Sequence, residues 1–69
     1  MDYYDRRKQA TDLISELIKN GVDTEHILLV IEEKYGFGER FTNGYISRLV
    51  KANYIVANNK GGFDIVKQI

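Results

Sequence analysis

The chain contains no cysteine, no proline and only one histidine. Without cysteine it has no disulfide framework, and nothing points to an oxidising compartment. A structural zinc site needs four cysteine or histidine ligands, which His26 alone does not provide. The longest apolar run, residues 27–31, is far shorter than the roughly 18 residues that cross a bilayer. Because the first residues also lack the basic-then-apolar order of a signal peptide, we expect a cytoplasmic protein with no membrane span.

Signatures of catalysis are missing as well. The chain shows no Ser–His–Asp order, no phosphate-binding loop and no metal-ligand spacing. Glu32 and Glu33 are adjacent, so on a helix they point in different directions and do not form a carboxylate dyad. The Gly36–Phe37–Gly38 segment follows no strand and fails the dinucleotide-binding fingerprint. We therefore expect a protein that is not an enzyme and needs no cofactor.

A length of 69 residues predicts a single domain over residues 1–69. A domain this small buries only about 60% of the surface that its unfolded chain exposes, so its stability is marginal. Small domains often gain stability from disulfides, metals or a second subunit. Since the first two are not available here, we expect a homodimer.

The net charge of zero conceals an uneven distribution of charge along the chain. Residues 1–39 hold nine acidic and five basic side chains, a sum of −4, whereas residues 40–69 hold one acidic and five basic side chains, a sum of +4. A basic half gives the protein an asymmetric electrostatic field, and its positive side favours a polyanionic partner. The alternative is that so few charges are segregated by chance.

Apolar residues at helical spacing predict three helices, over about residues 2–20, 23–35 and 42–52. Gly21 and Gly36 are typical of the left-handed residue that follows a helix, and Asn53 tolerates the same conformation. Asp23 and Thr42 are expected N-caps. The expected inward-facing residues are, in chain order, Ala10, Leu13, Ile14, Leu17 and Ile18, then Ile27, Leu28, Ile31 and Tyr35, then Ile46, Leu49 and Val50.

After Asn53 the apolar period changes to two. Residues 54–57 and 63–66 are rich in strand-forming side chains, and residues 58–62 have the composition of a turn. The pattern predicts a β-hairpin over about residues 54–67, which must pack on the helices because an isolated hairpin is not stable in water. The expected fold is mainly α with a C-terminal β-hairpin. We expect Phe41, Ile46, Leu49 and Ile55 to be buried.

With this order of elements, the chain resembles the winged helix-turn-helix superfamily of small DNA-binding regulators. The residues that carry the resemblance are 41–55, which end in Leu49, Asn53, Tyr54 and Ile55, followed by Gly61, Gly62 and Phe63. The glycine-rich segment 36–40 is typical of the turn in such proteins. The superfamily commonly has glycine where this chain has Asn53.

The resemblance implies that the third helix enters the major groove of double-stranded DNA and that the hairpin contacts the flanking backbone. The function implied is that of a sequence-specific transcriptional regulator. Arginine and asparagine read base edges, whereas serine and lysine suit phosphates. The expected DNA-binding residues are Arg40, Asn43, Gly44, Ser47, Arg48, Lys51 and Lys60.

Two sets of candidate residues would also suit a surface with no binding role. The basic side chains Arg48, Lys51 and Lys60 would also suit a solvated surface and an ordinary hairpin tip. Tyr3, Arg7, Ala10 and Leu29 are candidate contacts with a second subunit or another protein partner, but the first three would also suit a frayed helix end, and a single exposed leucine is ordinary. His26 has no expected partner.

The alternative function is a winged-helix module that binds another protein and no DNA. Winged-helix domains also occur in assembly and sorting complexes, and fold does not determine function. A sequence pI near 6.6 favours this alternative, whereas the basic C-terminal half favours DNA. Retention on DNA that is reversed by salt would distinguish the two.

Overall fold

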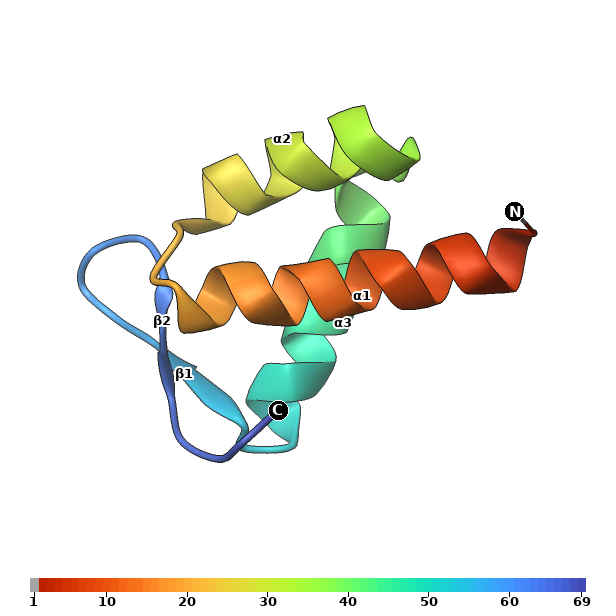
Figure 1. The fold of residues 1–69 in the computed structure, drawn as a ribbon. Helices are drawn as coiled ribbons and strands as arrows, with labels where there is room; N and C mark the ends of the chain where they lie inside the picture. Colours follow the sequence, from red (N-terminus) through yellow and green to blue (C-terminus); the bar gives the residue numbers. More distant parts are fainter. Residues whose placement is uncertain (1) are drawn as a thin grey trace.

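A computed structural model describes residues 2–69 and shows three helices followed by a two-stranded antiparallel sheet (Figure 1). The predicted order of helix, helix, helix and hairpin is confirmed. The elements are α1 (Tyr3–Lys19), α2 (Thr24–Tyr35), α3 (Glu39–Lys51), β1 (Ile55–Ala57) and β2 (Phe63–Ile65).

Both ends of α2 and the C-terminal end of α3 follow the residues that the sequence predicts. The carboxylate of Asp23 accepts a hydrogen bond from the backbone N–H of His26, 2.9 Å away, and so caps α2. Gly36 ends α2 in the left-handed conformation, with φ 77°. Asn53, after α3, has φ 64°, as expected from the tolerance of asparagine for this region.

The start of α3 differs from the prediction. The helix begins at Glu39, with Gly38 as its extended N-cap, so Thr42 lies inside the helix and does not cap it. The early start places Phe41 in the first helical turn, where its ring stacks on that of Phe37 with centroids 4.2 Å apart. Glycine is an acceptable cap, and Glu39 lies near the positive end of the helix dipole. Thr42 becomes fully buried instead.

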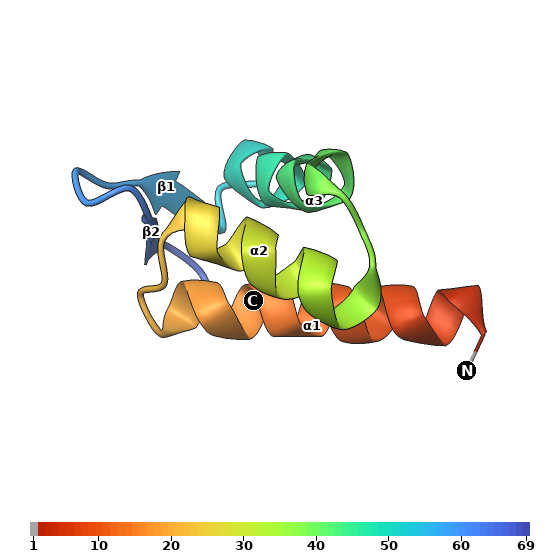
Figure 2. The same cartoon turned by 90° about the horizontal axis from the view of Figure 1, so that it is seen from above.

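The three helices are arranged in layers. α1 and α2 run side by side in opposite directions, and α3 crosses them at a steep angle on one side (Figures 1 and 2). The hairpin lies at the end of the helical layers where α1 stops and α2 begins. α1 begins at the end of the molecule farthest from the hairpin, and the chain finishes after β2.

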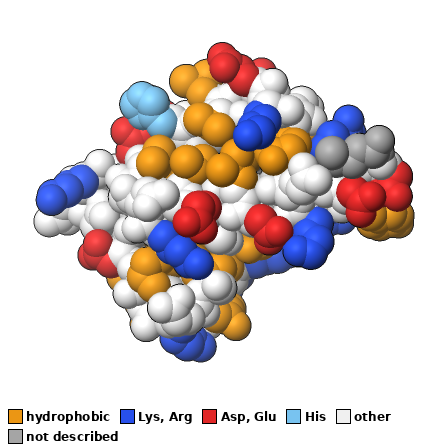
Figure 3. All heavy atoms as spheres, in the orientation of Figure 1, with side chains coloured by type: hydrophobic (Ala, Val, Ile, Leu, Met, Phe, Trp, Pro, Cys, Tyr) orange, Lys and Arg blue, Asp and Glu red, His pale blue; other side chains and the backbone are white. Residues whose placement is uncertain are grey.

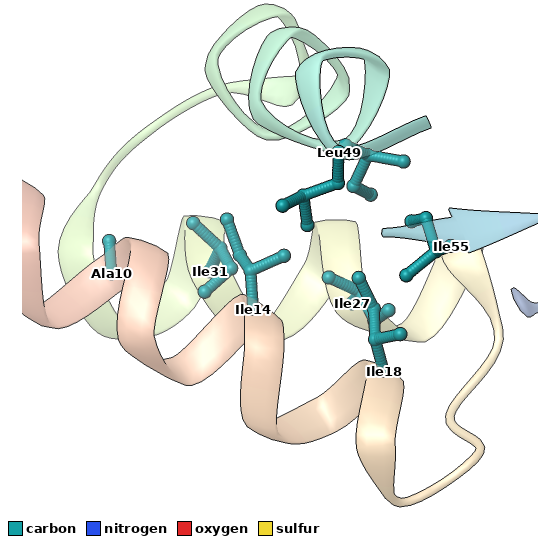
Figure 4. Close-up of a cluster of buried hydrophobic side chains, with 8 residues drawn as sticks. Ala10, Ile14, Ile18, Ile27, Ile31, Leu49 and Ile55 are labelled. Atoms are coloured by element: carbon teal, nitrogen blue, oxygen red, sulfur yellow. The ribbon is translucent and has the colours of Figure 1, made fainter. Parts of the chain in front are cut away.

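Branched aliphatic side chains from every helix and from β1 converge on one core (Figure 4). Two expectations about it are wrong. Phe41 is only partly buried, because its ring stacks on that of Phe37 at the edge of the core. Val50 is 40% exposed, because α3 turns Thr42, Ile46 and Leu49 toward the core instead. The fully buried apolar residues are Ala10, Ile14, Ile18, Ile27, Ile31, Ile46, Leu49 and Ile55.

The hairpin is short and is fixed to the helices at both ends. Ile55 pairs with Ile65, and Ala57 pairs with Phe63. Ile55 is buried in the core, and the backbone N–H groups of Val66 and Lys67 donate to the carbonyl of Tyr54. The hairpin therefore packs as predicted, since it gains from the helices the buried surface that it lacks by itself.

Candidate nucleic-acid interface

The outer side of α3 carries most of the residues predicted to bind DNA. Thr42, Ile46 and Leu49 face the core, so the opposite side of the helix faces solvent. The early start of α3 adds Arg40, which was expected in the turn, to this helical surface. We call the exposed set the α3 outer face: Arg40, Asn43, Gly44, Ser47, Arg48 and Lys51.

A polar contact fixes α3 against α1. The hydroxyl of Tyr45 lies 2.9 Å from that of Ser15, and this hydrogen bond is partly buried. Ser15 belongs to the inner side of α1, between the buried residues Ile14 and Ile18. Because Tyr45 and Leu49 both contact the inner layers, the rotation of α3 about its axis is set, and with it the direction of the outer face.

The cations of the α3 outer face have no carboxylate partner. In residues 2–69 the ion pairs are Lys8 with Asp12 and Asp23 with His26, and neither involves α3. Glu39 is the acidic residue of α3 and sits in its first turn. An unpaired guanidinium or ammonium group on a helix remains available to an anionic partner. The charge segregation seen in the sequence is therefore realised as a basic helix surface.

Lys60 is exposed on the turn of the hairpin, and this turn is held by side chains rather than left free. The side-chain oxygen of Asn58 accepts hydrogen bonds from the backbone N–H groups of Lys60, at 2.9 Å, and Gly62, at 3.1 Å. The backbone N–H and the hydroxyl of Thr24 both donate to the carbonyl of Gly61. These bonds connect the hairpin turn to the start of α2.

Part of the basic surface comes from α1 and from the end of the chain, and was not predicted. Arg7 and Thr11 of α1 line a groove together with Arg40, Gly44 and Arg48 of α3. No spacing in the sequence indicates this proximity, since it depends on the angle at which α3 crosses α1. The ammonium of Lys67 lies 5.0 Å from the ring centroid of Tyr54, near the C-terminal end of α3. Lys67 contributed to the charge count, but no role was predicted for it.

The residues predicted to contact a partner do not form one surface. Ala10 is completely buried, so the expectation that it contacts a partner is wrong: the core extends along α1 to Ala10, which belongs to the same cluster as Ile31 (Figure 4). Tyr3 packs edge-on against Phe37 and is half exposed, and Arg7 is half-buried in the groove. Leu29 is 58% exposed and stays a candidate contact.

The prediction that His26 has no partner is also wrong. Its Nδ1 lies 2.7 Å from the carboxylate of Asp23, one helical turn before it. The backbone and ring contacts from His26 hold the pKa of the Asp23 carboxyl below its usual value. The pair stabilises the start of α2, at the point where the hairpin turn is attached.

Residues 2–69 hold no helix that combines the length and apolar character needed to cross a membrane. They bring together no group of three or more histidine, cysteine, aspartate or glutamate side chains that would bind a metal ion. In comparisons with protein families, curated proteins and solved structures, this chain matches none of them.

Proposed function

We propose that this chain is a winged helix-turn-helix protein that binds double-stranded DNA. In this proposal α2, the short turn at residues 36–38 and α3 form the helix-turn-helix, and the hairpin of β1 and β2 is the wing. The order of these elements, and the position of α3 on the outside of the helical layers, support the proposal.

The observation that carries the proposal is the composition of the α3 outer face. Arg40, Arg48 and Lys51 are exposed, have no carboxylate partner in residues 2–69, and alternate with Asn43 and Ser47. A helix with this surface fits the major groove, where arginine pairs with guanine and asparagine with adenine. Gly44 in the middle of the face lets the helix axis come close to the base edges.

The basic surface of one chain is small, with three cations on α3 and Lys60 on the hairpin turn. We therefore extend the proposal to a homodimer acting as a transcriptional regulator, because a second chain doubles the number of phosphate contacts. Light scattering across micromolar concentrations measures this directly: a monomer at every concentration would contradict the dimer, without affecting DNA binding by the single chain.

Salt-dependent binding to duplex DNA tests the function. Fluorescence anisotropy of a labelled duplex at several salt concentrations should show an affinity that falls with salt, with a slope of about 0.9 per neutralised phosphate. Lys51→Ala should lower that slope by about one per chain. Lys34→Ala is the matched control, since Lys34 is an exposed lysine in the last turn of α2 and does not belong to the α3 outer face.

A second candidate function is binding to another protein. The face formed by α1 and α2 has a row of hydrophobic side chains near α2 and mixed charges elsewhere (Figure 3). Leu29 on α2 is 58% exposed, and Val56 and Val66 of the hairpin region are at least half exposed. Apolar side chains of this kind favour a protein partner. If the parent chain binds no duplex at low salt, this second function replaces the first.

A further inference from the structure

A groove of about 290 Å³ lies between the N-terminal half of α1 and the adjoining flank of α3. That volume is roughly ten times the ~30 Å³ that one water molecule occupies in the liquid, and it is at the lower end of the range for ligand sites. The space suits a small group rather than a large ligand. The residues that line it are Arg7, Thr11, Arg40, Phe41, Gly44, Tyr45 and Arg48.

Three arginines line this groove, and no acidic residue does. Arg7 comes from α1, whereas Arg40 and Arg48 come from the first and last turns of α3. In residues 2–69 none of the three has a carboxylate within salt-bridge distance. Asp12, which follows the groove residue Thr11, pairs with Lys8 at 3.1 Å. Three like charges around one small space repel one another, and an anion between them would offset that repulsion.

Aromatic and hydroxyl groups support the walls of the groove. The guanidinium carbon of Arg7 lies 5.9 Å from the ring centroid of Phe41, and this contact restricts the side chain. Tyr45 is fixed by its bond to Ser15. Gly44 adds no side chain, and a Cβ built there would meet nothing within 4 Å, so the middle of the groove is open. The groove is therefore shaped before any ligand arrives.

The geometry points to a phosphate-binding site in this groove, with Arg7 and Arg40 as its ligands, whereas Arg48 also lines the groove and keeps its proposed contact with a base edge. Guanidinium groups bind phosphate oxygens through paired N–H donors, which suits arginine better than lysine for this task. The phosphate has two sources: the backbone of bound DNA, or a free phosphate or small phosphorylated compound. The first source depends on the proposed function, whereas the second does not.

The test pairs two neighbouring arginines of α1. Arg7→Gln removes a groove ligand. Arg6→Gln is the matched control, because Arg6 makes a similar contact with the Phe37 ring, at 5.1 Å, and does not line the groove. Inorganic phosphate is titrated into the full chain at constant ionic strength while amide signals are followed by two-dimensional NMR. We expect saturable shifts at Thr11, Gly44 and Arg48, an affinity about tenfold weaker in Arg7→Gln, and no change in Arg6→Gln.

Duplex binding by the same variants separates the two sources. Weaker DNA binding in Arg7→Gln than in Arg6→Gln assigns the groove to a backbone phosphate, with or without a detectable effect of free phosphate. If phosphate shifts the amide signals but Arg7→Gln leaves duplex binding unchanged, the groove is assigned to a free phosphorylated ligand. The same assignment holds if phosphate shifts the signals and the chain binds no duplex. If Arg7→Gln does not fold, Arg7→Lys keeps the charge and the stem but loses the paired donors, and takes its place.

Failure of the site and failure of the proposed function give different results. A parent chain that binds DNA, with Arg7 and Arg6 variants equal to it in both titrations, overturns the phosphate site and leaves the proposed function standing. A parent chain that binds phosphate in the groove but no duplex overturns the proposed function alone.

Discussion

The hydroxyl of Ser15 on α1 lies 2.9 Å from the hydroxyl of Tyr45 on α3 and joins positions 30 residues apart. Tyr45→Phe leaves Ser15, which is buried, without this partner. We expect a loss of about 1 kcal/mol in the free energy of unfolding, seen as a lower urea midpoint. Ser15→Ala with Tyr45→Phe should cost less than the sum of the single changes, because the pair is then removed as a unit. Strictly additive losses would show that the two hydroxyls do not interact.

Thr42 is fully buried, and its hydroxyl has no hydrogen-bond partner within residues 2–69. Thr42→Val keeps the shape of the side chain and removes a polar group that burial separates from water. We expect the variant to be more stable by about 1 kcal/mol, which raises the melting temperature by roughly 4–8 °C in a domain of this size. Thermal unfolding followed by circular dichroism measures it. A lower melting temperature would mean that the hydroxyl is satisfied.

Leu49 connects α3 to the core and is 7% exposed. Leu49→Ala should lower the free energy of unfolding by about 2–5 kcal/mol, since it removes buried methyl groups and leaves a cavity. Such a loss is a large part of the stability of a small domain. Val50→Ala is the control: its side chain is 40% exposed, against 7% for Leu49, and urea unfolding should detect a clearly smaller loss. Equal losses in the two variants would contradict the orientation of α3.

Acid should weaken the start of α2. The backbone N–H of His26, and then its side chain, lower the pKa of Asp23 from its ordinary value of 3.8. A carboxylate with a lowered folded pKa adds stability that is complete above the unfolded pKa and disappears as the pH falls through the folded pKa. Asp23→Asn keeps an N-cap but does not titrate. The stability difference between parent and variant should therefore shrink below about pH 4, as urea midpoints between pH 6 and pH 2 will show. A constant difference would contradict the shift.

Arg48 and Lys60 should affect DNA binding in different ways. Arg48→Ala should cost about 1–3 kcal/mol on a preferred site and much less on random DNA, because arginine reads guanine. Lys60→Ala should weaken binding to both similarly, since a lysine on the hairpin turn contacts phosphate. Competition between specific and random duplexes at several salt concentrations measures both effects. Equal discrimination in parent and Arg48→Ala would exclude base recognition by Arg48.

Local patterns in the sequence predicted the helices because each signal acts within a few residues. Asp23 and Gly36 identify the ends of α2 by their own conformations, and Asn53 does so after α3. The start of α3 was predicted one turn too late because threonine and glycine are about equally good N-caps, so capping preference alone does not select Gly38 over Thr42. The stacking of Phe37 on Phe41 accompanies the earlier start, and such a contact is not visible in capping preferences.

The candidate site also has a part that the sequence predicts and a part that depends on tertiary packing. Residues of the α3 outer face follow from helical spacing on one element, so the sequence identified them together. Arg7 and Arg40 meet only because α3 crosses α1, and a spacing of 33 positions carries no signal of that crossing. Ala10 was predicted to lie on the apolar stripe of α1 and also to contact a partner, because the length of the core along α1 depends on how the helices pack, which is a tertiary property.

The attachment of Thr24 to Gly61 has a consequence for how the chain folds. These hydrogen bonds close a loop of 37 positions, whereas each helix forms through bonds only four positions apart. Closing a long loop lowers the entropy of the chain before the contact gives any stabilisation, so contacts between residues far apart in the sequence form late. We expect the three helices to assemble first and the hairpin turn to dock last. In pulse-labelled hydrogen exchange, the amide of Thr24 should then gain protection after those in the middle of α1 and α2.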